Sequence, residues 1–527
     1  MKSENNSLPR LINSGEGLNV FYKDRFLYSK KRPDASVEKL VDSLSLNEFT
    51  LYLIPSPLLF KGISRILKKL PRNSFLLCLE KDQTLARFSI DYAIRDNKLE
   101  YIRSADTRGL LKALEDKNDL FYRDADIIAL NGAYALNKAF YLETLNEIRK
   151  LLSLNWKNKM TMIYMSRMWI QNIFRNIVYC SNNNAISDIK IKKPILTVGA
   201  GESLEKNINE IKKNRDRLYI LAADTALPAL IHSGILPDAV VALEAQIYNL
   251  RDFYDLSDNE KMTLFYDLSS HPRVHDFFNG PKIPFISRFS KLNIFSDLER
   301  YALLPFAIPP LGSVGLTALF LASKLSEDSV GFIGLDFSYN IGKSHSKGVE
   351  SHKRLLYSSN RIKSSDYSLR HFAGGSRKYS DFDSKVWSDP VLYNYSIQCR
   401  EVLKNGYYID CGTGGFISGT NKASVSDLAK LANKDNVTLL SAPKKTEKIK
   451  IKEFFEEKKE ALTAIMDISA AGWSAELEGL LKKEDYIYCD FPEIDIFSHK
   501  DAAILSRLKK SAAKYLKVIE KALIVAF

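Results

Sequence analysis

Two closely spaced glycines after an apolar segment are the first feature of the sequence that could support chemistry. Residues 194–198, PILTV, are typical of a buried strand, and Gly199, Gly201 and Ser203 follow before a helical pattern that continues to about residue 213. A strand, a G-x-G turn and a helix form a common phosphate cradle, because glycines let the backbone approach an anion and the helix N-terminus presents N–H groups. A purely structural turn is the alternative. Leu204 replaces the third glycine of the dinucleotide motif, which argues against NAD.

Polar side chains also end the next two predicted strands. Asp224 and Thr225 follow the strand at 218–222, and Glu244 follows the strand at 239–243. A carboxylate at the position of Asp224 commonly binds a ribose hydroxyl, but it could equally cap the helix predicted over 226–232. Because the carboxyl ends of parallel strands meet at one edge, we expect these groups to face a common ligand.

Three later segments add candidates to this edge. Gly312 and Ser313 precede a fully apolar helix predicted over 314–325, whose N-terminus would face an anion. Asp336 and Tyr339 follow a predicted strand at 330–334. Residues 412–415, GTGG, which include Thr413 and Gly414, follow a strand at 407–410 and form either a backbone nest for an anion or a tight turn.

A long basic segment follows the strand at 330–334. Residues 343–378 contain nine Lys or Arg against two acidic residues, and they also contain His345, His352 and His371. The segment is either a solvated basic loop or a cover over a phosphate-bearing substrate.

Two other motifs have the spacing of metal ligands, but neither predicts a metal site. His271 and His275 have the spacing of a zinc motif, but Pro272 replaces the catalytic glutamate. Asp381 and Asp383 form a D-x-D pair in a polar segment, which leaves metal-dependent transfer as a minor alternative. We therefore expect no metal site.

The composition limits the class of protein that holds these groups. The chain has 527 residues, 45% hydrophobic and 26% charged, with a net charge of +13, so we expect two to four globular domains and an anionic partner. Five cysteines without C-x-x-C spacing indicate a reducing compartment. Residues 301–323 carry no charge, but their prolines and glycines predict a loop that enters a buried helix instead of a membrane span.

The order of elements predicts an α/β fold with two Rossmann-like parallel-sheet domains and a helical C-terminal domain. Residues 1–155 alternate strands and helices (strands at 49–54, 75–80 and 127–130), without a glycine-rich turn. Residues 156–437 hold the motifs above and begin with a bridging helix in which Asn172 and Asn176 share one face. Residues 438–527 are mostly helical.

Several blocks, in order, resemble the motility-associated factor (Maf) family of flagellin glycosyltransferases. The blocks are ILTVGAGESLEKNI, YILAADTALPALIHSGILPDAVVALEAQ, PPLGSVGLTALFLASKL, VGFIGLDFSYNIGKSHSKG and IDCGTGGFISGT, and the bridging SRMWIQNIFRN also fits. The resemblance covers mostly residues 165–420 and extends more loosely over 20–165. GAGESL and the GSV and GLDF segments also resemble a bacterial sialyltransferase family that uses CMP-activated sugars. The central domain is similar to an archaeal hydroxymethylpterin diphosphokinase as well.

The resemblance implies transfer of a nonulosonic acid, such as pseudaminic or legionaminic acid, from CMP to Ser or Thr of flagellin. It implies that the cytidine and phosphate lie near Gly199, Gly201 and Ser203, with polar groups from Asp224 and Thr225. It also implies that Gly312 and Ser313 contact the sugar and that Asp336 and Tyr339 lie near the leaving group. The first unit lacks the glycine-rich turn that is common in the family.

The sialyltransferase histidine base has no evident counterpart, so the base is inferred from the histidines present. His345 is nearest in sequence to the strand end at Asp336, within the family-like GKSH turn, and the hypothesis is that it is the base or a phosphate ligand. A histidine without a role is the alternative. We further expect a cytoplasmic enzyme with no cofactor beyond its CMP-sugar co-substrate, no nucleic-acid partner and no transmembrane segment. A pterin diphosphokinase, an S-adenosylmethionine methyltransferase and a flagellin-binding chaperone are the competing functions.

Overall fold

The chain divides into two compact units, Met1–Met162 and Ile163–Phe527. The computed structural model describes residues 8–527 except 72, 104–121, 183–185, 258–260, 341–342, 363, 365–377, 433–438, 441–447, 469–472 and 492–501. The two units are described separately below. Helix α5 (Lys138–Asn176) begins in the first and ends in the second.

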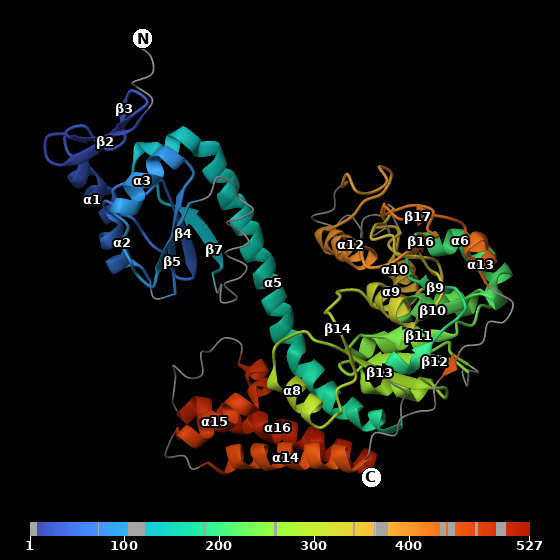
Figure 1. Ribbon diagram of the computed structural model, residues 1–527. Helices are drawn as coiled ribbons and strands as arrows, with labels where there is room; N and C mark the ends of the chain where they lie inside the picture. Colours follow the sequence, from blue (N-terminus) through green and yellow to red (C-terminus); the bar gives the residue numbers. More distant parts are fainter. Residues whose placement is uncertain are drawn as a thin grey trace. The chain divides into compact units, whose positions relative to one another are not determined.

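The first unit contains a parallel sheet, as the alternation of apolar segments and helices predicts (Figure 1). Its strand order is β6-β5-β4-β7, and β4 (Thr50–Pro55) pairs in parallel with both β5 and β7. The strands predicted at 49–54 and 75–80 are present, and a small antiparallel sheet precedes them. The elements are β1 (Arg10–Asn13), β2 (Leu18–Tyr22), β3 (Arg25–Phe26), α1 (Pro33–Ser43), α2 (Ile63–Lys69), β5 (Phe75–Glu80), α3 (Gln83–Asp91), β6 (Leu99–Arg103) and β7 (Asp124–Ile127).

Strand β7 lies earlier in the chain than the strand predicted at 127–130. Asp124 and Asp126 alternate with inward-facing residues, and Arg149 pairs with both carboxylates at 3.3 and 3.8 Å. Polar and apolar residues alternate along β7 because one of its faces is exposed. The sequence prediction instead followed the continuous apolar segment IIAL at 127–130.

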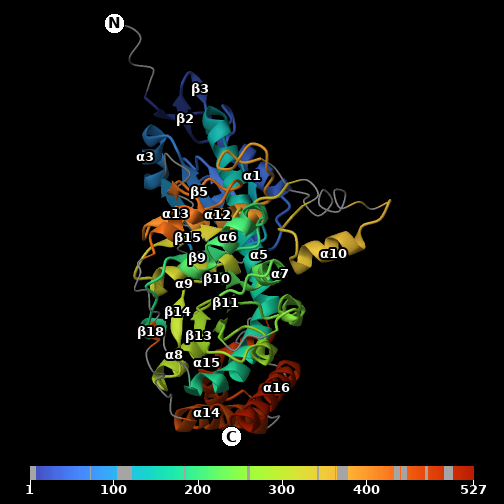
Figure 2. The same ribbon diagram turned by 90° about the vertical axis from the view of Figure 1, so that its right-hand side faces the viewer.

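The second unit is built on a nine-stranded sheet within its described residues, with order β14-β13-β12-β11-β10-β9-β15-β16-β17 and parallel pairing throughout. Figure 2 shows β13, β11, β10, β9 and β15 in succession. The strands are β9 (Ile195–Val198), β10 (Tyr219–Ala223), β11 (Ala239–Ala242), β12 (Thr263–Asp267), β13 (Lys282–Ser287), β14 (Phe306–Ile308), β15 (Val330–Ile333), β16 (Tyr408–Asp410) and β17 (Asn421–Lys422). A separate two-stranded sheet pairs β8 (Ile189–Lys190) with β18 (Leu439–Leu440).

The chain order reverses at the centre of this sheet. From β9 the chain adds strands outward to β14, and it then returns to place β15 on the other side of β9. Such a reversal opens a crevice between the strand ends, which is where doubly wound sheets bind ligands. The α/β class expected from the sequence is therefore confirmed.

Side chains alternate between two cores on opposite faces of the sheet. Leu196 and Val198 of β9 join a core that contains the end of α5 and the C-terminal helices, and Ile195 joins the other core with the apolar helix α9 (Val314–Leu325). The remaining helices are α6 (Glu202–Lys213), α7 (Leu227–His232), α8 (Asn293–Arg300), α10 (Glu350–Ser358), α12 (Pro390–Leu403), α13 (Val425–Lys430), α14 (Lys448–Asp467), α15 (Ala475–Lys483) and α16 (Ala502–Ala526). Short 3-10 turns, among them η5 (Asp224–Ala226) and η8 (Asp485–Asp490), connect several of them.

The end of α5 is fixed to this sheet by its two asparagines. Asn172 Nδ2 donates to the carbonyls of Ala245 and Ser269 at 3.3 and 3.0 Å. Asn176 Nδ2 donates to the carbonyls of Leu268 and Ser270 at 2.9 and 2.8 Å. The predicted bridging helix is thus confirmed, with its buried amides used to satisfy the ends of the β11 and β12 segments.

The C-terminal helices share the core of the second unit. Phe454, Phe455 and Tyr515 are buried in the same cluster as Phe174 of α5, and Lys458 of α14 is bound by Asp297 of α8 and by Glu484. The structure divides into two compact units, and the three domains expected from the sequence stay a prediction. Among the described residues, no helix is long and apolar enough to cross a membrane. All five cysteines are free thiols.

Candidate functional site

A pocket of about 490 Å³ lies at the reversal point of the nine-stranded sheet. Its lining comes from the segments that follow β9, β10, β11 and β15, and from the first residues of α9 and α12. Nine of the residues predicted from the sequence line it. They are Gly199, Gly201, Thr225, Glu244, Gly312, Ser313, Asp336, Tyr339 and His345.

The other predicted residues divide between a second cavity and the protein interior. Ser203, Thr413 and Gly414 line a smaller cavity of about 140 Å³, which shares Asp336 and Tyr339 with the main pocket. Asp224 lines neither of these two cavities and is 1% exposed. Most of the predicted residues therefore lie around one cavity at the expected edge of the sheet, while the part played by each residue in binding or catalysis stays a prediction.

Asp336 takes up the N-terminus of α6, where the sequence places a ligand phosphate. Its Oδ2 accepts from the backbone N–H of Ser203 at 2.8 Å, and its Oδ1 accepts from the Ser203 hydroxyl at 2.5 Å. The Ser203 hydroxyl in turn accepts from the N–H of Gly334 at 2.9 Å. Burial raises the pKa of Asp336 to about 6, against the effect of the hydrogen bonds from Ser203. The Asp336 carboxylate thus occupies the N-terminus of α6, where the sequence predicted a bound phosphate.

The two glycines of the first turn are required by the approach of two protein segments. A Cβ on Gly199 would lie 2.5 Å from the Gly334 carbonyl oxygen, and a Cβ on Gly201 would lie 2.6 Å from Asp336 Oδ2. The Gly201 N–H donates to the Gly334 carbonyl at 2.9 Å. The ends of β9 and β15 are therefore packed backbone to backbone, which explains the glycines without a ligand.

Asp224 is a buried carboxyl group that is not among the residues lining the candidate pocket, and its role in donor binding stays a prediction. Its Oδ1 accepts from the N–H of Thr225 at 2.7 Å at the start of η5. Burial raises its pKa well above the usual range, and the nearby Asp252 and Glu244 raise it further. The structure shows no side-chain cap at the start of α7, which is the alternative interpretation of this residue.

Glu244 and Asp389 place carboxyl groups in the pocket itself. Burial raises the pKa of Glu244. Asp389 accepts from the N–H groups of Val391 and Leu392 at 2.8 and 3.0 Å and so caps α12. The sequence analysis missed Asp389, although Asp before Pro390 is a usual helix start and could have signalled it. Tyr395, on the second turn of α12, was missed as well, and it lines the same pocket.

The described start of the basic segment is attached to the first turns of α6. Lys343 pairs with Glu205 at 2.5 Å, and the Lys347 N–H donates to the same carboxylate at 3.1 Å. Ser346 donates from its N–H to the Ala200 carbonyl at 2.9 Å. These bonds hold His345 against the pocket, and its Nδ1 lies 3.0 Å from the Ser344 hydroxyl. Burial lowers the pKa of His345, and neighbouring His352 lowers it further, so the imidazole is neutral near pH 7.

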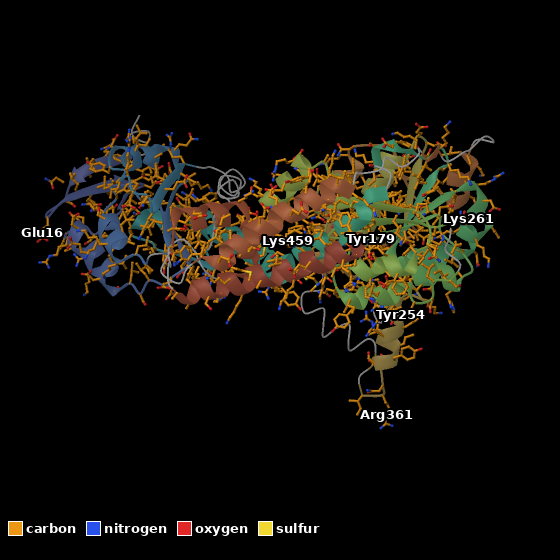
Figure 3. All side chains as sticks on the ribbon, turned by 90° about the horizontal axis from the view of Figure 1, so that it is seen from below. Glu16, Tyr179, Tyr254, Lys261, Arg361 and Lys459 are labelled. Carbon is orange, nitrogen blue, oxygen red and sulfur yellow. The ribbon has the colours of Figure 1, made fainter. Side chains whose placement is uncertain are left out.

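The start of α10 stays close to this contact, since His352 is buried near His345, whereas the rest of the described segment extends away from it. Helix α10 projects from the body of the unit in Figure 2, and Figure 3 shows Arg361 at the far end of that projection. Residues 363 and 365–377, which include His371, lie outside the described residues.

The two sequence motifs considered for metals have other partners. Asp381 Oδ2 accepts from Arg400 at 2.8 Å, and Asp383 Oδ1 accepts from the Lys385 N–H at 2.9 Å. His275 is 4% exposed and stacks on Tyr179 with ring centroids 4.0 Å apart. Burial and Lys282 lower the pKa of His275 to about 3, so it is a neutral core residue. Among the described residues, no group of three or more His, Cys, Asp or Glu side chains is arranged to hold a metal ion.

Part of the chain matches a known protein family, and two proteins of one organism are similar to it in sequence. Residues 168–342 match the family of 6-hydroxymethylpterin diphosphokinase MptE-like proteins. An uncharacterised protein of Treponema pallidum (strain Nichols) is 28% identical over 547 aligned positions, covering 97% of this chain and 95% of that protein. A second uncharacterised protein of that organism is 28% identical over 122 positions, covering 22% of this chain and 58% of its own length.

The fold is that of a solved glycosyltransferase. The structure of the MAf glycosyltransferase from Magnetospirillum magneticum AMB-1 matches with a TM-score of 0.57 and 12% identity, covering 98% of this chain and 90% of that one. At this identity the likeness concerns the fold, and the resemblance to the Maf family read from the sequence is confirmed at that level. The matched family model covers β9 to β15, the part that forms most of the pocket.

Proposed function

We propose that the chain is a glycosyltransferase that moves a nonulosonic, sialic-acid-like sugar from a CMP donor to a Ser or Thr hydroxyl of flagellin. The observation that carries the proposal is the pocket at the reversal point of the sheet, in a fold shared along 98% of the chain with a Maf glycosyltransferase. Its volume of about 490 Å³ falls in the usual range for small-molecule sites.

The donor phosphate is best accommodated at the N-terminus of α9. Asp336 already occupies the N-terminus of α6, whereas the structure shows no side-chain cap at Ser313, which precedes α9. Residues 312–315 all line the pocket, so the first N–H groups of this twelve-residue helix are available to an anion. This proposal moves the phosphate from Gly199 and Gly201, where the sequence reading placed it, to Gly312 and Ser313.

The reaction requires a proton acceptor and a stabilised leaving group. The acceptor hydroxyl oxygen forms a bond to the anomeric carbon, the bond from that carbon to the phosphate oxygen breaks, and CMP departs with the electron pair. His345 is neutral and lines the pocket, so it can take the hydroxyl proton. Glu244 is the second candidate base, because burial raises its pKa toward the range of a useful proton acceptor.

The direct test is transfer in a purified system. The full chain is incubated with CMP-pseudaminic or CMP-legionaminic acid and flagellin, and CMP release is measured together with the intact mass of flagellin. We expect one CMP for each sugar added, and we expect the His345→Ala chain to remain folded while it loses most of this activity. A folded chain that neither releases CMP nor changes the mass of flagellin with either donor contradicts the proposal.

A pterin diphosphokinase is the second candidate, favoured by the family match over residues 168–342. It would transfer a diphosphate from ATP to the hydroxymethyl group of a pterin and release AMP. Release of AMP from ATP only when 6-hydroxymethylpterin is present would replace the first proposal. A thermal-shift panel of CMP, ATP and S-adenosylmethionine separates these two functions from a methyltransferase, because each requires stabilisation by a different nucleotide.

We also propose that the reaction takes place in the cytoplasm, without a nucleic-acid partner and without a resident cofactor. Cell fractionation with detection of the chain beside unmodified flagellin tests this location, and recovery of the chain outside the cytoplasmic fraction would contradict it.

A further inference from the structure

A second concave surface lies in the other half of the second unit, between the end of α5 and helix α16. Its volume is about 500 Å³, and of the described side chains that line it most are cationic and none is acidic. We call this surface the basic groove. It is lined by Gln171, Arg175, Lys510, Ala513, Lys514, Lys517, Val518 and Lys521.

The spacing of residues on α16 creates the groove. Leu508, Ala512, Tyr515, Ile519 and Ala522 recur at helical spacing and are buried in the core. The lysines at 510, 514, 517 and 521 recur at the same spacing, each two residues after a member of the buried set, so they form one row on the side of the helix away from that core. On the facing helix, Gln171 and Arg175 are one turn apart, beside the anchored Asn172 and Asn176.

The positive charge of the groove is not neutralised by the described side chains. None of the described hydrogen bonds or ion pairs involves the side chain of Arg175 or of the four groove lysines, whereas Lys458 on α14 is bound by two carboxylates. Asp490 is the nearby acid, but it is already bound by Arg167 and by the Ser511 hydroxyl, the latter at 2.6 Å. Like charges one turn apart repel each other, and no described acidic side chain pairs with the lysines of the row to offset that repulsion.

Lys514 also lies in the field of two arginines and one carboxylate. Burial lowers the pKa of Lys514, Asp490 opposes that effect, and the guanidinium groups of Arg167 and Arg175 lower the pKa further. Positive charge extends beyond Arg175 to Arg273. Burial is the main cause of the lowered pKa of His271, and Arg175 and Arg273 lower it further. A bound anion would relieve several of these interactions at once.

The geometry of the row favours an extended chain of carboxylates over other polyanions. Lysines three or four residues apart on a helix are separated by about 4.5 or 6 Å along the axis. Side chains on one face of an extended peptide repeat every 6.6–6.8 Å, close to that spacing, so carboxylates on alternate residues can each meet a lysine. Among the described lining residues there is no aromatic side chain to stack a base, and the concave form does not match a flat membrane surface.

We propose that the basic groove binds an acidic, extended segment of a partner protein, whose alternate carboxylates pair with Arg175 and with the lysines of α16. The proposal does not rest on the sugar-transfer chemistry, because none of the groove residues lines the candidate site.

The test uses a fluorescein-labelled twelve-residue peptide of alternating Glu and Ser and the full-length chain. Fluorescence anisotropy should show binding at about 50 mM salt that weakens steeply as salt is raised. The Lys514→Gln/Lys517→Gln chain should bind roughly tenfold more weakly, since each exposed charge pair contributes up to about 1 kcal/mol. The matched control is Lys452→Gln/Lys459→Gln on α14, which removes the same charge elsewhere in the unit and should bind like the wild type. Figure 3 labels Lys459.

The other possible results of this binding experiment would overturn the proposal. An equal loss in both double variants would show non-specific attraction by net charge and overturn it. Equal binding of a Gln/Ser peptide, or no binding at low salt, would overturn it as well. Tighter binding of a single-stranded DNA of equal charge, or of phosphatidylserine vesicles, would assign the groove to another partner. If thermal unfolding shows that the first variant is damaged, Lys510→Gln/Lys521→Gln at the two ends of the row provides the same comparison.

Discussion

The carboxylate of Asp336, at the end of β15, accepts hydrogen bonds from both the N–H and the hydroxyl of Ser203, at the start of α6. The two residues are 133 positions apart in the sequence. This pair joins the two strands on either side of the chain reversal and closes the helix end that a phosphate would otherwise occupy. It also makes the stability of the site dependent on pH.

Asp336→Asn should change how stability varies between pH 4 and pH 7. The pKa of Asp336 is raised from 3.8 to about 6 in the folded chain, so the folded state binds this proton more tightly than the unfolded state. The resulting stabilisation is complete below about pH 4 and is lost as pH rises through about 6, a change of about 3 kcal/mol. Relative to the wild type, the variant should gain Tm as pH rises from 4 to 7. A constant Tm difference across that range would contradict the assignment.

Gly201→Val should destabilise the chain. The added side chain meets Asp336 and the Gly334 carbonyl within 2.7 Å, an overlap that costs about 1–3 kcal/mol. Gly414→Ala is the matched control, because a Cβ there meets nothing within 4 Å and its backbone is compatible with alanine. Thermal unfolding should show a lower Tm for the first variant only. A Tm for Gly201→Val equal to that of the wild type would show that the contact relaxes freely.

His345→Ala should lower turnover by roughly 10²–10⁴-fold with little change in CMP affinity if the imidazole accepts the acceptor proton. Because the pKa of His345 is lowered, wild-type activity should persist to a pH below the ordinary histidine value of 6.5 before it falls. Glu244→Gln provides the comparison for the competing base. Normal turnover in His345→Ala together with loss in Glu244→Gln would transfer the role to Glu244, while a collapse of CMP affinity in His345→Ala would make it a ligand.

Sugar transfer should be insensitive to EDTA. The D-x-D carboxylates that could bind a metal-nucleotide are otherwise engaged, Asp381 by Arg400 at 2.8 Å and Asp383 by the Lys385 N–H at 2.9 Å. Activity is compared before and after chelation, with Mg²⁺ and Mn²⁺ added back. Complete loss with EDTA and recovery with either ion would favour metal-dependent transfer.

Lys458→Met should destabilise the chain by about 3–5 kcal/mol, because it leaves the Glu484 carboxylate buried without its cation and leaves Asp297 with Arg300 alone. Lys459→Met, at the next position of α14, should change stability by less than about 0.5 kcal/mol. Urea unfolding of both variants measures the difference. Similar midpoints for the two would show that the buried pair contributes nothing to holding α14 on the second unit.

The sequence by itself determined the elements and the edge of the sheet where the candidate site lies. Apolar segments such as 194–198 and 330–334 form strands in any context that can bury them, and the polar residues that follow them necessarily meet at one carboxyl edge. The fully apolar helix of residues 314–325 was predictable for the same reason, since hydrophobicity on all sides requires burial on all sides. Asn172 and Asn176 were likewise identifiable as satisfied polar groups on a packed helix.

Only the tertiary structure decided what each group at that edge faces. The sequence cannot show that β15 lies beside β9, because strand order is set by packing across 130 residues of intervening chain. That pairing brings Asp336 onto the N-terminus of α6, turns Gly199 and Gly201 into contacts between backbone segments, and leaves the start of α9 as the uncapped helix end. It buries Asp224 and brings Asp389 and Tyr395 of α12 into the pocket. Local pattern fixes which residues form an element, whereas distant contacts determine which polar groups are satisfied by the protein and which remain available to a ligand.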